Sequence, residues 1–233
     1  MGELFSGMAT LLEKYDVLGA FWMTIKLTVV AAVGSLVIGT VVAILRVAPI
    51  GALRIFGTAY VNTIRNTPLT LIVFFFAFGF MNTLGWSIAP RDSPTSLADN
   101  NFWFGVIGLS VYHAAFVAEA LRSGINTVPA GQAEAARAIG LSFMPALTNV
   151  ILPQAFRGAI APLGTTLIAL TKNTTVLATI GVAELSYIMS GMLEFNISLL
   201  FAIFVLIALA FVILTLPMGF FFTWLSRRLV VQR

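Results

Sequence analysis

Five long apolar runs constrain the fold of this chain more than any other feature of its sequence. They cover roughly residues 18–45, 59–86, 102–121, 156–180 and 197–225, and polar segments separate them. Each run can cross a bilayer, because a crossing takes about 20 mainly apolar residues. Charged residues make up only 9% of the 233 residues, where a soluble domain has about a quarter. We therefore expect an all-α integral membrane protein with five transmembrane helices, forming a single transmembrane domain over residues 1–233.

The basic residues predict the direction in which the chain crosses the membrane. An odd number of crossings puts the termini on opposite sides, and Lys and Arg collect on the cytoplasmic side. With the N-terminus outside, nine of the thirteen basic residues lie at or near the cytoplasmic face: Arg46, Arg54, Arg65, Arg122, Arg137, Arg157, Arg227, Arg228 and Arg233. Lys14 and Arg91 then lie outside, and most acidic residues, Glu184 among them, also lie outside. The prediction is a multi-pass protein with an external N-terminus and a cytoplasmic C-terminus.

Several classes of function are disfavoured by what the sequence lacks. No GxxxxGK[ST] phosphate-binding loop occurs, so the chain is not an ATPase of that type. The chain has no cysteine and a single histidine, His113, so neither thiolates nor a histidine cluster can hold a metal. The apolar runs carry no paired carboxylates and no Ser/His/Asp set, which argues against a membrane enzyme. The basic residues are scattered at the ends of the runs, so no nucleic-acid partner is expected.

The polar segment between the third and fourth runs predicts a short helix that ends at a glycine. Residues 129–140, PAGQAEAARAIG, begin with a proline suited to a first helical turn and continue with strong helix formers. Gly140 can adopt the left-handed conformation that ends a helix. A second helical piece over 142–150 would return the chain to the membrane. The exposed face is mostly alanine, so a groove on another protein can close over it with little loss of side-chain entropy. An ordinary amphipathic helix at the membrane interface is the alternative.

The order of residues in this segment resembles the coupling loop of bacterial ABC-importer permeases: EAA at 134–136, three residues, Gly140, nine residues, then VILP at 150–153. The resemblance extends from about residue 21 to 185. It includes YVNTIRNTPLTLIVFFFAFG, AAFVAEALRSGINTVPAGQAEAARAIGLS, ILPQAFRGAIAPLGTTLIALTKNTT and IGVAEL. These segments are similar to the polar amino-acid permeases of ABC importers, of the histidine, glutamine, arginine and glutamate type. The similarity is greatest to the permeases of glutamate importers.

The resemblance implies a function and a set of partners. The chain would be the permease subunit of an ATP-driven importer in the bacterial inner (cell) membrane, for glutamate or another acidic amino acid. It would pair with a homologous permease subunit, identical or different, and work with two ATP-binding subunits, an extracellular solute-binding protein and membrane lipid. The residues that would couple it to the ATPase are Gln132, Glu134, Ala135, Ala136 and Gly140. The chain itself would hold no cofactor, since the partner ATPase binds ATP and Mg.

Charge and polarity within the fourth run predict where substrate passes. Lys172 lies beyond the midplane, toward the outside, among threonines, and so dense a polar cluster predicts a water-filled cavity or a locally broken helix. Many relatives have KDTS where this chain has KNTT, so Asn173 removes a possible anionic partner and leaves Lys172 to favour an anionic substrate. The substrate-pathway candidates are Lys172, Asn173, Thr175 and His113. Two alternatives remain open: Lys172 extends to the outer interface or pairs across a dimer, and His113 packs between helices.

Two further groups of polar residues predict local interactions near the inner ends of the runs. Glu119 and Arg122 are three residues apart and are expected to form an ion pair. Arg65 shares a helix face with Asn62 and Asn66, just before Pro68 disturbs the helix. We expect Arg65 to cap backbone carbonyls or to bind lipid head groups.

The sequence also leaves other functions open. The chain could be a permease for glutamine, arginine or histidine, since the same family includes all three. A mainly structural half of a heterodimeric permease is a second possibility. A channel or passive carrier is a third, and it would need no coupling helix.

Overall fold

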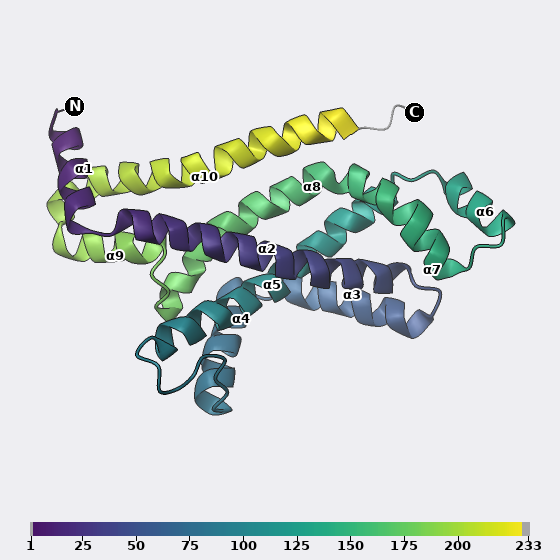
Figure 1. The fold of residues 1–233 in the computed structure, drawn as a ribbon, viewed down its shortest axis with the longest axis horizontal. Coiled ribbons are helices and arrows are strands. Elements are labelled where there is room, and N and C mark those ends of the chain that lie inside the picture. Colours follow the sequence, from purple (N-terminus) through teal and green to yellow (C-terminus); the bar gives the residue numbers. More distant parts are fainter. Residues whose placement is uncertain (1, 230–233) are drawn as a thin grey trace. The chain divides into compact units, whose positions relative to one another are not determined.

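The computed structural model describes residues 2–229, and every regular element in that range is a helix (Figure 1). Arg233, which the charge argument placed inside the cell, lies outside the described residues. The α-helices are α1 Gly2–Lys14, α2 Val17–Val47, α3 Gly51–Arg65, α4 Leu69–Phe74, α5 Ser96–Ile125, α6 Ala130–Ala138, α7 Phe143–Ala146, α8 Leu152–Asn173, α9 Leu185–Phe195 and α10 Leu200–Leu229. Two π-helices, η1 Phe75–Thr83 and η2 Leu147–Ile151, and two 3-10 helices, η3 Thr174–Ile180 and η4 Ile197–Leu199, complete the described elements.

The candidate membrane spans agree with the predicted runs, but two of them are bent. Three helices are long and apolar enough to cross a membrane alone: Val17–Val47, Ser96–Ile125 and Ile197–Leu229. Gly51–Arg65 and Leu69–Thr83 form a pair bent by 105°, and Phe143–Ile180 and Leu185–Phe195 form a pair bent by 55°. Counting each bent pair as one span gives five. The all-helical fold and its membrane character are therefore confirmed, while five complete crossings remain a prediction.

Pro68 explains where the sharper bend lies. Proline lacks a backbone N–H and keeps the residue before it out of the helical conformation. Pro68 itself has an extended ψ of 133° and is the N-cap of α4, directly before the new helix starts at Leu69. The predicted disturbance at this residue is confirmed, and its effect is a change of helix direction between α3 and α4.

The chain divides into two compact units. Unit 1 comprises Met1–Gly34, Thr67–Ser110 and Ala169–Leu216, and unit 2 comprises Ser35–Asn66, Val111–Ile168 and Pro217–Arg233. The division falls within α2, α5, α8 and α10, so each of these helices contributes residues to both units.

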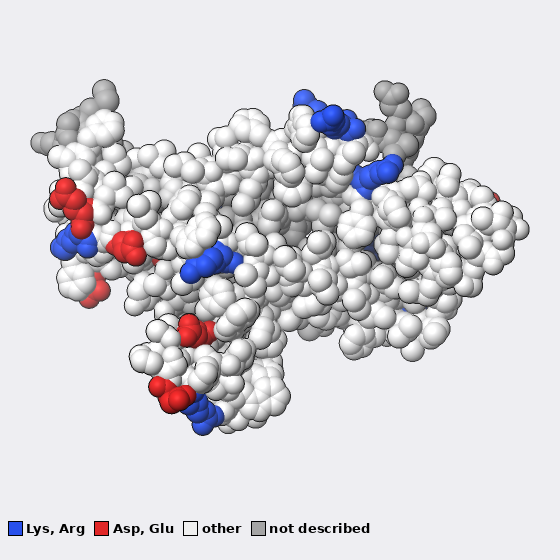
Figure 2. All heavy atoms as spheres, viewed as in Figure 1, with Lys and Arg blue, Asp and Glu red and all other residues white. Residues whose placement is uncertain are grey.

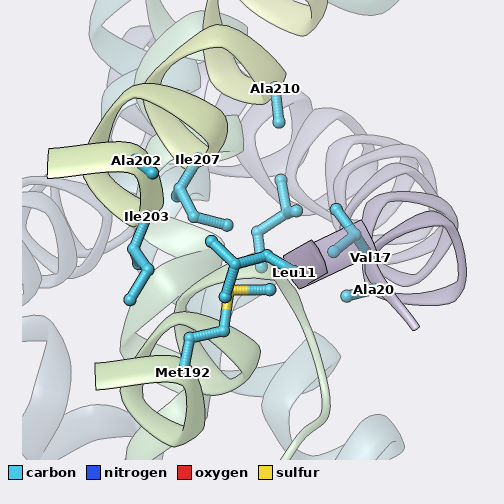
Figure 3. Close-up of a cluster of buried hydrophobic side chains, with 9 residues drawn as sticks. Leu11, Val17, Ala20, Met192, Ala202, Ile203, Ile207 and Ala210 are labelled. Atoms are coloured by element: carbon cyan, nitrogen blue, oxygen red, sulfur yellow. The ribbon is translucent and has the colours of Figure 1, made fainter. Parts of the chain in front are cut away.

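The core of unit 1 is formed by the ends of four helices (Figure 3). Leu11 of α1 lies among side chains from α2, α9 and α10, and it is fully buried. The neighbours are apolar: Val17, Ala20, Leu185, Met192, Ala202, Ile203, Ile207 and Ala210. Since α9 and α10 follow α1 by more than 170 residues, this core joins distant parts of the sequence.

Unit 2 has a separate core of small residues on α2, α3, α5 and α8, including Ala43, Val61 and Ala115. Close approach is visible at Gly39, where a Cβ atom would lie only 2.8 Å from the carbonyl oxygen of Ala114. Small residues allow the backbones of membrane helices to approach closely. This close packing stabilises the helix pair, since lipid provides no hydrophobic driving force between helices. A substitution that added a side chain at Gly39 would force α2 and α5 apart.

Exposed apolar side chains mark the surface that suits lipid. Val29, Val33, Val37 and Val41 are spaced four apart on α2 and are each 53% to 61% exposed. Residues four apart lie on one helix face, so these valines form a continuous apolar stripe. Figure 2 shows charged atoms only as small separate groups on a face that is otherwise uncharged.

Candidate functional site

The short helix predicted over residues 129–140 is present as α6, and Gly140 ends it as expected. Pro129 precedes the helix, and Gly140 has a φ of 87°. The N–H of Gly140 donates to the carbonyl of Arg137 at 2.9 Å, and the N–H of Leu141 donates to that of Ala136 at 3.0 Å. This pair of bonds is the Schellman arrangement, which needs a left-handed residue at the position of Gly140. The second helical piece is also confirmed, as α7 and η2, with Ser142 as its N-cap.

The five candidate coupling residues do not all face the same way. Ala136 is only 3% exposed, whereas Gln132, Glu134, Ala135 and Gly140 are exposed. Four of the candidates are therefore accessible on the surface, whereas Ala136 packs against its own unit.

Sequence reasoning missed the most exposed apolar residue beside this helix. Ile139, the C-cap of α6, is 77% exposed, and Met144 of α7 is 50% exposed. The sequence signal for this exposure was an isoleucine directly before the glycine that ends the helix. At that position the side chain lies past the last helical turn, so the helix does not cover it. These two side chains add apolar area to a surface on which the sequence predicted mainly alanine.

The helix changes its hydrogen-bonding pattern at the substrate-pathway candidates, while the predicted cavity or full break there stays a prediction. The α-helix α8 ends at Asn173 and continues as the 3-10 helix η3. Lys172 is exposed, and it makes no ion pair with any residue that the structure describes. Thr175 Oγ1 donates to the carbonyl of Lys172 at 2.8 Å, and Thr174 Oγ1 donates to that of Thr171 at 2.8 Å. These two threonines thus satisfy their own hydroxyls locally, and the Lys172 ammonium has no ion-pair partner within residues 2–229.

A turn with a buried carboxylate follows η3 in the same unit. Gly181 adopts a φ of 80°, and Asn101 Nδ2 donates to the carbonyl of Ile180 at 2.7 Å. Glu184 is fully buried and is the N-cap of α9, where its Oε1 accepts a bond of 2.9 Å from the N–H of Tyr187. Its other oxygen, Oε2, has no hydrogen-bond partner among the described residues.

The burial of Glu184 is a feature that the charge argument did not address. The charge argument placed it on the outer side, which stays a prediction, and the structure adds that its side chain is enclosed by protein. A carboxylate before a helix is favoured by the unpaired N–H groups of the first turn, which explains why the chain retains it there.

His113 lies in unit 2, whereas Lys172, Asn173 and Thr175 lie in unit 1. The imidazole is 1% exposed, and it packs against the rings of Tyr112 and Phe116 at centroid distances of 5.2 and 5.9 Å. This is the packing arrangement given above as the alternative. A place in the substrate pathway remains a prediction.

Three arginines converge on Glu119 in unit 2. Arg122 Nη2 lies 3.0 Å from Glu119 Oε2, which confirms the predicted pair. Arg46 also binds this carboxylate, and Arg65 Nη1 lies 3.9 Å from it while its guanidinium lies over the ring of Phe116. Sequence reasoning missed both contacts, because both arginines are distant from Glu119 in the sequence, Arg46 by 73 residues. Arg65 thus makes an internal charge contact that was not predicted, while its contact with lipid head groups stays a prediction.

The two units differ in charge. Of the described residues, unit 2 holds eight arginines and only two acids, Glu119 and Glu134. Unit 1 holds Lys14, Lys26, Arg91 and Lys172, and most of the acids. The units are defined by packing and not by charge. Even so, the residues predicted to lie on the cytoplasmic side fall mainly in unit 2, and those predicted to lie outside fall mainly in unit 1.

Comparison with known proteins assigns this arrangement to a family. The sequence profile of binding-protein-dependent transport system inner membrane components matches residues 35–231, which include α6, Lys172 and Glu184. The chain belongs to this family. Its membership accounts for the apolar helices and makes the chain a multi-pass membrane component of a transport system.

Relatives of this transport component are similar over nearly their whole length. The glutamate transport system permease protein GluC of Corynebacterium efficiens is 52% identical over 94% of this chain and 96% of its own. The probable glutamine ABC transporter permease protein GlnM of Bacillus subtilis is 36% identical over 90% and 91%. The crystal structure of an amino acid ABC transporter with histidines superposes with a TM-score of 0.78 at 26% identity, covering 95% of this chain and 98% of that one.

Proposed function

We propose that this permease imports glutamate or another acidic amino acid as one subunit of an ATP-driven importer. The observation that carries the proposal is the 52% identity to two glutamate transport permeases, extending over 94% of the chain. Lys172 is exposed and has no ion-pair partner among the described residues, and its neighbour is Asn173. A cation without a neighbouring carboxylate attracts the negative charge of a substrate, so Lys172 supports an anionic substrate. Glutamine is the second candidate, because a permease described as a probable glutamine transporter is 36% identical.

The partners follow from the same proposal. An importer of this kind combines a homologous permease subunit, two ATP-binding subunits that hold ATP and Mg, and an extracellular solute-binding protein. The exposed residues Gln132, Glu134 and Ala135 of α6 would contact the ATPase, with Ile139 adding apolar contact area. Since the matched relatives are permease subunits, ATP hydrolysis is assigned to the partner and not to this chain. The whole of residues 1–233 would form one transmembrane domain.

Reconstitution tests the substrate and the dependence on ATP together. We expect proteoliposomes that contain the permease, its ATPase and its binding protein to accumulate labelled glutamate only when ATP is present. Unlabelled aspartate should compete, and arginine and histidine should not. Accumulation without ATP would show a passive carrier, and competition by glutamine alone would reassign the substrate.

The proposed orientation has the N-terminus outside and the coupling helix inside. It rests on the eight arginines of unit 2, since basic residues collect on the cytoplasmic side. Because the chain has no cysteine, single cysteines can be introduced without background labelling. An impermeant maleimide should label Asp92→Cys in intact cells, and it should label Ala138→Cys, on the exposed surface of α6, only after lysis. Labelling of Ala138→Cys in intact cells would reverse the orientation.

A further inference from the structure

A cavity of about 560 Å³ lies in unit 2, apart from the residues discussed for substrate or coupling. Arg46 of α2 lines it together with one face of α3, formed by Gly51, Arg54, Ile55, Thr58, Ala59 and Asn62. These α3 residues are spaced by three and four, so they form a single stripe. Arg54, Thr58 and Asn62 make the stripe polar, while Ile55 and Ala59 make its edge apolar.

The cavity gathers hydrogen-bond donors suited to an anion. Arg54 Nη1 donates to the carbonyls of Ala48 and Pro49 at 3.0 and 3.1 Å, which fixes the guanidinium beside the start of α3. Its Nε and Nη2 donate to no residue that the structure describes. The N-cap Ile50 offers no side-chain hydrogen bond, so the first N–H groups of this 15-residue helix are also uncapped. A guanidinium with free N–H groups that lines a cavity favours a phosphate or carboxylate there, and the uncapped helix start adds positive potential.

Charge on the other side of the cavity is also positive. Arg46 is paired with Glu119, but the same carboxylate also forms an ion pair with Arg122 and lies near Arg65. The three arginines therefore leave an excess of positive charge around the one acid. Apart from Glu119, the only acid of unit 2 is Glu134, so a second copy of unit 2 would bring mainly like charge to this surface.

The apolar edge identifies the kind of anion. Ile55 lines the cavity and is 72% exposed, and Ile50 and Phe56 beside it are 59% and 64% exposed. A free phosphate would gain nothing from these side chains, whereas the acyl chains of a phospholipid would cover them. Basic pockets between membrane helices bind anionic lipid head groups, because the basic side chains attract the negative charge. We propose that this cavity, defined by Arg46, Arg54 and Thr58, binds the head group of an anionic phospholipid, with acyl chains along Ile55.

Lipid binding to the purified full chain tests the proposal directly. Phosphatidylglycerol titrated into the detergent-solubilised protein should appear as a bound adduct in native mass spectrometry. Arg54→Gln should weaken that binding about tenfold, since it removes a charge-assisted contact. Arg157→Gln is the matched control, because Arg157 is an exposed arginine of the same unit that does not line the cavity. This variant should bind phosphatidylglycerol as well as the unmodified chain does. Equal binding by Arg54→Gln and the unmodified chain would overturn the site.

Two further comparisons separate a lipid from other occupants. Phosphatidylcholine with the same acyl chains should bind more weakly than phosphatidylglycerol, and inorganic phosphate at equal concentration should not displace the latter. Displacement by phosphate would mean a free-anion site instead of a lipid site. A photoreactive label on Thr58→Cys, in membranes that contain the assembled importer, should cross-link to lipid. Cross-linking to another protein subunit would overturn the proposal and identify the surface as a subunit contact.

Discussion

Replacing Gly140 with valine should reduce substrate uptake to background while the protein still inserts into the membrane. Gly140 has a φ of 87°, and a β-branched residue with positive φ is a strong conformational outlier. The two hydrogen bonds that end α6, from Gly140 to Arg137 and from Leu141 to Ala136, depend on this conformation. Valine would therefore unwind the end of α6 and move the surface proposed to dock on the ATPase. ATP-dependent uptake in proteoliposomes measures the effect.

Matched variants separate conformation from bulk. No atom lies within 4 Å of a Cβ built at Gly140 or at Gly131, so neither site is crowded. Gly131 lies within α6 and does not have a positive φ, and Gly131→Ala should keep normal uptake. Gly140→Asn should keep most of it, because asparagine tolerates the left-handed conformation. Normal uptake by Gly140→Val would remove the coupling role proposed for α6.

Charge reversal on the same helix tests its surface. Glu134 is exposed, so Glu134→Lys changes the docking face without disturbing packing. If α6 contacts the ATPase, Glu134→Lys should also abolish uptake while α6 keeps its fold.

Replacing Lys172 with glutamine should lower glutamate uptake at least tenfold without affecting assembly. An anionic amino acid loses hydration when it enters the bilayer, and a nearby cation offsets part of that cost. At 4 Å and an effective dielectric constant of about 20, the attraction is about 4 kcal/mol, and it is smaller where water reaches the side chain. Lys172 is exposed and makes no described ion pair, so its charge is available to a substrate. Uptake rates and copurification of the ATPase should be measured together.

Lys26 supplies the control for this variant. It is an exposed lysine within α2, which is a candidate membrane span. If uptake depends on a lysine at position 172 and not on the total positive charge, Lys26→Gln should leave uptake unchanged. Asn173→Asp should weaken uptake, because it places a competing negative charge beside Lys172. If Lys172→Gln imports glutamate at the native rate, the lysine merely extends to the membrane interface, and the substrate proposal depends on similarity to the glutamate permeases alone.

The sequence by itself determined the features that depend on neighbouring residues. The apolar runs predicted the long helices, Pro68 predicted a disturbance of the helix, and Gly140 predicted the end of α6. The pair of Glu119 and Arg122 was predictable for the same reason, because residues three apart on a helix are neighbours. In each case the physical cause acts within about one turn of the chain.

Only the tertiary structure decided which distant side chains meet. Arg46 reaches Glu119 because α2 packs against α5 in unit 2, and Glu184 is buried because α9 packs into the core of unit 1. Helices that are apolar on every side carry little periodic signal to show which face turns toward protein and which toward lipid. The partners of buried charges, and the cavity beside α3, therefore follow from helix packing and cannot be read from local sequence.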